Sequence, residues 1–169
     1  STTGVGGYNM NGGSLAANSG IRVGGTGIGT LNQNGGVIFA KGGINIARIA
    51  GSFGTNNLNG GVLSTFNIAT STGTNAVFNF NGGTLQANFN PGSPWFGTGI
   101  QASILAGGAF IDSSNFNVAI AAPLLAGSAN GGLTKLGTGT LTLSGVNTFT
   151  GPITNTAGSL ILNSASTYA

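Results

Sequence analysis

The sequence contains no cysteine, no histidine and no glutamate, and its only acidic residue is Asp112. Hydrolysis by paired carboxylates therefore lacks its second acid, and a serine nucleophile lacks a histidine base. Zinc, haem and iron–sulfur sites lack their usual protein ligands. These absences predict a protein that is not an enzyme and that binds no metal and no cofactor.

Charge is equally scarce, because charged residues make up 3% of the chain against roughly 25% in an ordinary soluble domain. Nucleic-acid binding requires clustered lysines and arginines, and the few basic residues here are scattered, so we expect no nucleic-acid partner. No apolar run is long enough for a membrane-spanning segment. We expect the cations to point to solvent, with contact to anionic glycans as the alternative. They are Arg22, Lys41, Arg48 and Lys135.

Glycine is abundant, with 34 of 169 residues, yet 40% of the chain is hydrophobic, which argues against disorder. A Gly-Gly pair, usually after an asparagine, recurs at steps of 23, 25, 22, 25 and 24 residues. Such pairs supply the positive φ angles of sharp corners, and stacked asparagines can hydrogen-bond along an axis. We call these sites the Asn-Gly-Gly corners. Their residues are Asn11, Gly12, Gly13, Asn34, Gly35, Gly36, Asn59, Gly60, Gly61, Asn81, Gly82, Gly83, Gly107, Gly108, Asn130 and Gly131.

Short alternating segments flank each corner, as at 31–34, 78–81 and 44–46. A period of two is typical of a strand with one apolar face, and no helical period of useful length occurs. Leu133 comes one place early in the sixth unit, and Lys135 follows it. In the earlier units a large apolar residue lies three places after the first glycine: Leu15, Ile38, Leu63, Leu85 and Phe110.

Units of about 24 residues with about three short strands predict an all-β fold, a β-solenoid with one unit per coil. Strands would stack about 4.8 Å apart in roughly seven coils. We predict a single domain over 1–169, with Asn-Gly-Gly coils at 1–130 and a divergent unit at 131–163.

Residues 90–97 interrupt the rhythm with two prolines, which predicts a projecting loop. Trp95 and Phe96 in this loop either fold back over the solenoid or form an exposed contact for a neighbour or a sugar. Asp112 precedes a Ser-Ser-Asn run, and we expect it to form a turn by accepting backbone N–H groups.

The stretch 131–151 carries the pattern Gly-x-Leu-x-Lys-x-Gly-x-Gly-x-Leu-x-Leu-x-Gly-x-Asn-Thr-aromatic-Thr-Gly. It resembles the autotransporter-associated β-strand repeat, also called the passenger-associated transport repeat. Segments 106–112 and 120–125 are similar to stretches beside this repeat in large bacterial surface proteins. The resemblance implies a right-handed parallel β-helix, located extracellularly or at the bacterial cell surface. It also implies a repeat without catalytic residues that aids passenger folding and export.

The solenoid's ends would expose open strand edges, since neither a capping helix nor a charged terminal strand occurs in the sequence. A next subunit that covers such an edge head to tail generates a filament. The sequence therefore predicts a non-catalytic building block of an extracellular bacterial fibre, stalk or surface layer, with itself as partner. The alternative is an adhesin or passenger segment of a larger autotransporter-like protein that binds glycans or assists export.

Overall fold

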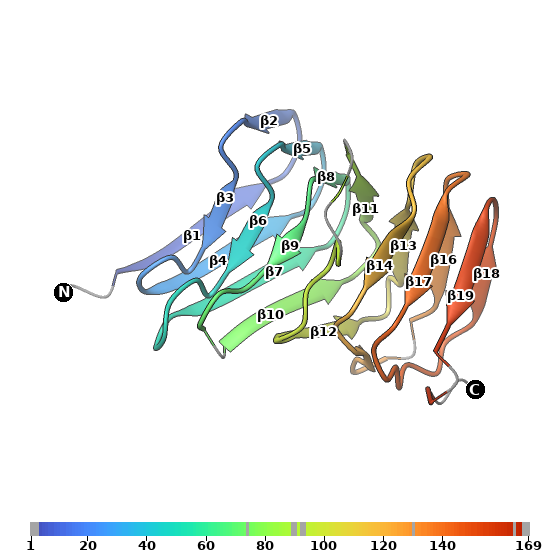
Figure 1. Ribbon diagram of the computed structural model, residues 1–169. Coiled ribbons are helices and arrows are strands. Elements are labelled where there is room, and N and C mark those ends of the chain that lie inside the picture. The colour runs from blue at the N-terminus through green and yellow to red at the C-terminus, as the bar shows by residue number, and fades with distance from the viewer. Residues whose placement is uncertain are drawn as a thin grey trace.

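The computed structural model describes residues 4–73, 75–88, 91, 94–129, 131–163 and 165–166. All the secondary-structure elements of these residues are β-strands, and the chain winds into seven coils stacked along one axis (Figure 1). Every pairing between strands is parallel. The predicted all-β solenoid is therefore confirmed.

The first three coils contain three strands each. They are β1 (Val5–Met10), β2 (Ser14–Ala17) and β3 (Ile21–Val23), then β4 (Ile28–Gln33), β5 (Val37–Ala40) and β6 (Ile44–Ile46), then β7 (Phe53–Leu58), β8 (Val62–Thr65) and β9 (Ile68–Ala69). The fourth coil contains β10 (Asn75–Phe80) and β11 (Thr84–Ala87). The remaining coils contain β12 (Ile100–Ile104), β13 (Ala109–Asp112) and β14 (Val118–Ile120), then β15 (Leu124–Ala126), β16 (Leu133–Leu136) and β17 (Thr140–Leu143), then β18 (Ile153–Asn155) and β19 (Ser159–Leu162).

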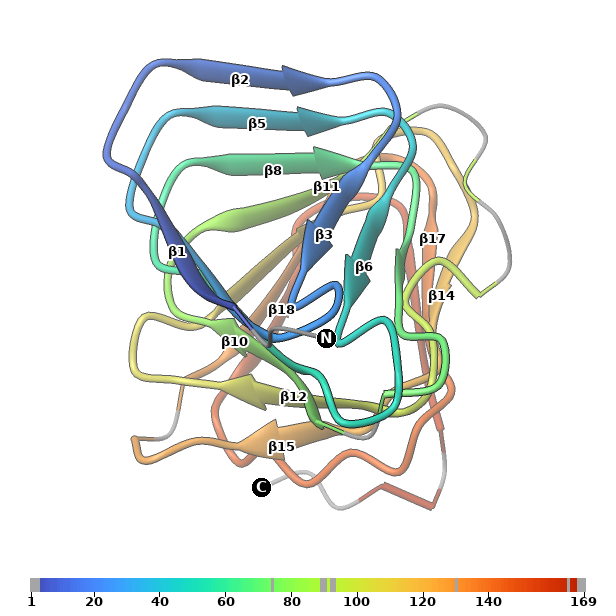
Figure 2. The same cartoon turned by 90° about the vertical axis from the view of Figure 1, so that its left-hand side faces the viewer.

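Equivalent strands of successive coils form three faces. The first face has the order β1-β4-β7-β10-β12-β15, and the second has β2-β5-β8-β11-β13-β16-β18. The third face consists of two sheets, β3-β6-β9 and β14-β17-β19. Seen from the N-terminal end, the chain runs clockwise as it recedes, so the solenoid is right-handed, as the family resemblance implied (Figure 2).

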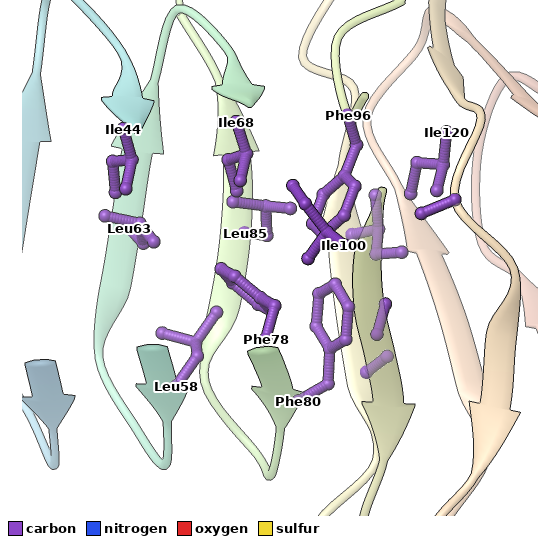
Figure 3. Packing of buried hydrophobic residues seen from close by; sticks show 14 of the residues in the cluster. Ile44, Leu58, Leu63, Ile68, Phe78, Phe80, Leu85, Phe96, Ile100 and Ile120 are labelled. Atoms are coloured by element: carbon purple, nitrogen blue, oxygen red, sulfur yellow. The ribbon is translucent and has the colours of Figure 1, made fainter. Parts of the chain in front are cut away.

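Alternate side chains of every face point inward and form a thin core. On the second face, Leu15, Ile38 and Leu63 lie in register, and Leu85 and Ile111 continue the column. Figure 3 shows side chains from the three faces meeting between the sheets. Each fully buried side chain of this size stabilises the fold by about 1.5–3 kcal/mol.

The prediction that Phe110 belongs to this column is wrong. Ile104 pairs with Phe80 and Phe110 pairs with Thr84, so five residues, 105–109, separate the paired positions at this corner, against three, 81–83, in the coil before. One of the two extra residues follows the first glycine, so the inward position is Ile111, four residues after Gly107, and it pairs with Leu85. Phe110 pairs with Thr84 and is half-buried.

The predicted loop at 90–97 returns to the solenoid at its end. Asn90, Gly92 and Ser93 lie outside the described residues. Phe96 forms single-residue parallel bridges with Ile68 on one side and Ile120 on the other. One residue therefore joins the two sheets of the third face.

Candidate functional site

The Asn-Gly-Gly corners lie above one another at the junction between the first and second faces. The N–H of Val37 donates to the carbonyl oxygen of Gly13 at 2.9 Å, and that of Val62 donates to Gly36 at 2.9 Å. Further along, Ala109 donates to Gly132 at 2.9 Å. The structure thus brings the described corners into one column along the axis, while Asn130 lies outside the described residues.

The column requires glycine at its tightest points. Gly13, Gly36 and Gly61 have φ angles of 75°, 70° and 72°, which L-residues with a Cβ rarely adopt. A Cβ on Gly36 would also lie 2.5 Å from the carbonyl oxygen of Gly13 in the coil before it. A side chain here is therefore excluded both by backbone conformation and by the stacking of coils.

Asparagine side chains form a corner ladder along this column. The amide Nδ2 of Asn34 donates to Oδ1 of Asn11 at 2.8 Å, and Asn59 donates to Asn34 at 2.8 Å. Asn81 donates to Asn59 at 3.2 Å, and its own Oδ1 accepts the N–H of Gly107 at 3.0 Å. Each bond contributes about 0.5–1.5 kcal/mol, towards the lower end because the ladder is exposed.

A second ladder, the strand ladder, runs along the first face two residues before each of the first four corners. Asn32 donates to Asn9 at 2.7 Å, Asn57 to Asn32 at 2.7 Å, and Asn79 to Asn57 at 2.8 Å. Sequence reasoning missed this ladder, although an asparagine two places before each of the first four corner asparagines signalled it. In both ladders every Nδ2 donates towards the preceding coil, so both have the same polarity.

Trp95 and Phe96 are fully buried, so the interpretation of an exposed aromatic contact is wrong and the folded-back alternative holds. The indole Nε1 of Trp95 donates to the carbonyl oxygen of Thr65 at 3.1 Å. The ring of Phe96 packs edge-on against Phe78 with centroids 5.3 Å apart (Figure 3). Burying these rings fills the core where the described part of the fourth coil has no third strand.

Lys135 does not point to solvent, which corrects the prediction for this residue. It occupies the inward column between Ile111 and Asn155 and is fully buried. Its Nζ donates to the carbonyl oxygens of Leu136, Gly137 and Ala157 at 2.8, 2.7 and 3.0 Å. A long side chain can reach these acceptors from an inward position, which is how a cation is tolerated there.

Burial lowers the pKa of Lys135, and the carboxylate of Asp112 opposes that shift. Asp112 itself forms the predicted turn, since its Oδ1 accepts the N–H of Ser114 at 2.7 Å. Its Oδ2 accepts Nε2 of Gln86 at 2.9 Å. Arg22, Lys41 and Arg48 are exposed as predicted.

The two ends of the solenoid differ in what they expose. At the N-terminal end, a hollow of about 560 Å³ is lined by residues that include Tyr8, Leu15 and Ile21, and Val5 is 79% exposed. At the C-terminal end Ile161 is 53% exposed. Both ends therefore combine strand edges with apolar side chains.

The described part of the chain contains no group of three or more His, Cys, Asp or Glu side chains that could hold a metal ion. The same part of the chain contains no helix with the length and apolar character needed to cross a membrane.

The comparisons with known proteins identify one segment. Residues 133–155 match the family model described as Passenger-associated-transport-repeat. No curated protein and no solved structure matches the chain. The matched segment covers β16, β17 and β18 and includes Lys135. A repeat of this kind suggests a passenger domain of an autotransporter and is consistent with an extracellular or surface location. The resemblance found in the sequence is thus confirmed: the chain is a parallel β-solenoid that carries a passenger-associated-transport-repeat.

Proposed function

We propose that the chain is a non-catalytic building block of an extracellular bacterial fibre, stalk or surface layer that associates end to end. The observation that carries this proposal is the pair of open ends. Among the described residues, strands β1 and β2 at one end and β18 and β19 at the other have a paired neighbour on one side only. Open edges of this kind favour pairing with another chain.

Three observations support head-to-tail stacking. Another copy would place its strands parallel to those already present and would cover the N-terminal hollow. The side-chain amides of Asn9 and Asn11 begin the two ladders and would donate to acceptors at the end of the preceding copy. A net charge of +3 on 169 residues gives weak repulsion between identical subunits.

A second candidate is a passenger segment that assists export, and the match at 133–155 favours it. In that case further coils of the same polypeptide, rather than another copy, would cover the ends. The intact mass of the native polypeptide separates these two arrangements.

The edge of β1 offers a test by a single substitution. Ile28 donates to the carbonyl oxygen of Gly4, and Asn34 donates to that of Met10. Because parallel strands alternate the side to which they bond, the backbone groups of Val5 face the open edge. Val5→Pro removes an N–H that a neighbouring copy would use, without removing a bond within the chain. Val5→Thr keeps the N–H and is the matched control.

Sedimentation and electron microscopy over a range of concentrations measure the outcome. We expect the native chain and Val5→Thr to form rods longer than one chain, and Val5→Pro to stay short. Monomers at every concentration, or equal association of all three proteins, would contradict stacking through this edge.

A further inference from the structure

Five of the Asn-Gly-Gly corners contain an asparagine followed directly by a glycine, and this pair has a chemistry of its own. Asparagine is among the chemically labile residues of proteins. When nothing holds the backbone nitrogen of the glycine, that nitrogen can attack Cγ of the asparagine side chain, and glycine has no Cβ to hinder the approach. Whether a corner reacts therefore depends on how the fold holds these two groups.

From the second coil to the fourth, both groups of the corner are held by hydrogen bonds. The N–H of Gly35 donates to the carbonyl oxygen of Met10 in the preceding coil at 3.2 Å. That of Gly60 donates to Gln33 at 3.0 Å, and that of Gly82 donates to a carbonyl oxygen of the following coil at 2.9 Å. The asparagine amides of these corners are bound as well, since each Nδ2 donates to the preceding asparagine of the corner ladder. A reaction at any of these corners must first break these bonds.

The corner of the first described coil differs, because no described coil lies before it. The N–H of Gly12 has no acceptor among the described residues, and a Cβ on Gly12 would have no atom within 4 Å apart from its chain neighbours. The Nδ2 of Asn11 also has no acceptor in the described part of the chain, whereas its Oδ1 accepts Nδ2 of Asn34 at 2.8 Å. Both Asn11 and Gly12 are exposed. Among the described corners, only this one leaves both the attacking nitrogen and the leaving group unbound.

We infer that Asn11 is a site of spontaneous deamidation. The backbone nitrogen of Gly12 forms a bond to Cγ of Asn11 and releases its proton to water. The bond from Cγ to Nδ2 breaks, and Nδ2 takes up a proton from water and leaves as ammonia. The amide of Asn34, which donates to Oδ1, stabilises the negative charge that this oxygen gains during the attack. Water then opens the cyclic imide at either carbonyl carbon and leaves aspartate or isoaspartate at this position.

The aspartate product keeps a contact within the fold and changes the N-terminal end. A carboxylate oxygen still accepts Nδ2 of Asn34, so the corner ladder is retained. The amide hydrogens at the open end are lost, and the net charge falls by one from +3. A modified copy would then donate nothing from this position to a preceding copy, a consequence that rests on the proposed function. The reaction itself does not depend on end-to-end association.

Incubation of the full chain in mildly alkaline buffer, followed by trypsin digestion and mass spectrometry, tests the inference. Trypsin cuts after Arg22 and Lys41, so Asn11 and Asn34 fall in separate peptides, 1–22 and 23–41. Both asparagines precede Gly-Gly, so Asn34 is a control with the same local sequence. Fragment ions locate the modified residue within each peptide. The incubation uses a concentration at which sedimentation shows single chains, so that a stacked copy does not cover Asn11.

Two further measurements separate the effect of the fold from that of the sequence. The same incubation in denaturant removes the hydrogen bonds of the second coil, so Asn11 and Asn34 should react at equal rates there. Gly12→Ala adds a Cβ beside the attacking nitrogen, in open space where the fold tolerates it. Circular dichroism verifies that this variant folds, and its Asn11 should react more slowly than that of the native chain.

We expect Asn11 of the folded chain to deamidate about tenfold faster than Asn34, because Asn34 must first lose the two hydrogen bonds of its corner. Equal rates in the folded chain, or a slower reaction at Asn11, would overturn the inference. A difference that persists in denaturant would also overturn it, because the difference would then come from the sequence. So would a folded Gly12→Ala variant that deamidates at Asn11 as fast as the native chain.

Discussion

Replacing Lys135 by methionine tests whether its three hydrogen bonds stabilise the last coils. Methionine fills similar space in the inward column but donates no hydrogen bond. Leu136 keeps a donor, because its carbonyl oxygen also accepts the N–H of Ser113 at 3.1 Å. The carbonyl oxygens of Gly137 and Ala157 lose the lysine, and Ala157 belongs to the seventh coil. The damage should therefore be concentrated at the C-terminal end.

The magnitude follows from two opposing contributions. A buried carbonyl oxygen left without a donor costs about 1–3 kcal/mol. The two residues that lose the lysine here, Gly137 and Ala157, are only half-buried. Removing a buried ammonium group recovers part of that cost. We expect Lys135→Met to lower the free energy of unfolding by about 1–3 kcal/mol. Lys41→Met changes an exposed lysine and should have a smaller effect.

Denaturant unfolding and hydrogen exchange measure the effect. In Lys135→Met the amides of β18 and β19 should exchange faster, while those of β5 and β8 keep their rates. A variant that is at least as stable as the native chain, with unchanged amide hydrogen exchange, would show that Lys135 does not stabilise the seventh coil.

The pH dependence gives an independent check on the same residue. Because burial places the pKa of folded Lys135 below its ordinary value of 10.5, the unfolded chain binds more protons between those two values. The lysine therefore makes the free energy of unfolding rise with pH over that interval, and Lys135→Met should lose this contribution. A native chain whose dependence equals that of the variant would contradict the shift.

Two further substitutions test the corner and the buried loop residue. Gly36→Ala should lower the free energy of unfolding more than Gly51→Ala does. Both glycines have a positive φ, but only Gly36 stacks on Gly13. Equal losses of stability in thermal unfolding would show that the contact between the coils adds no cost. Trp95→Ala should lower it by about 3–5 kcal/mol, whereas Trp95→Phe should lose only about 0.5–1.5 kcal/mol with the indole bond. Trp95 is the only tryptophan, so its emission should lie at short wavelength until the fourth coil unfolds, and exposed-type emission from the native chain would disprove its burial.

The coil length, the parallel stacking and the position of the corners could all be predicted from sequence, because a repeat that stacks on itself places the same chemistry at the same place in each coil. The asparagine column illustrates this, since one Asn34 in isolation would say little, but the same residue at regular steps predicts a ladder. The turn at Asp112 was likewise predictable from a local sequence rule.

The failures have a common physical cause, which is that packing depends on the exact register. At Phe110 one extra residue after the first corner glycine changed which neighbour faces inward, and the Gly-Gly spacing did not reveal it. Lys135 was assigned to solvent from its charge alone, although its position in the inward register was visible once the strands were aligned. One of its acceptors, the carbonyl oxygen of Ala157, belongs to the next coil, so only the folded chain brings it to the lysine.

The shared polarity of the asparagine ladders has a consequence for growth. Two N-terminal ends brought face to face would set donor against donor, so copies cannot join in that way and continue the ladders. Both ladders end in the fourth coil, at Asn79 and Asn81, so only the N-terminal tip of a stack presents their amide hydrogens and the two tips are chemically distinct. Such a polymer could lengthen at unequal speeds at its two tips.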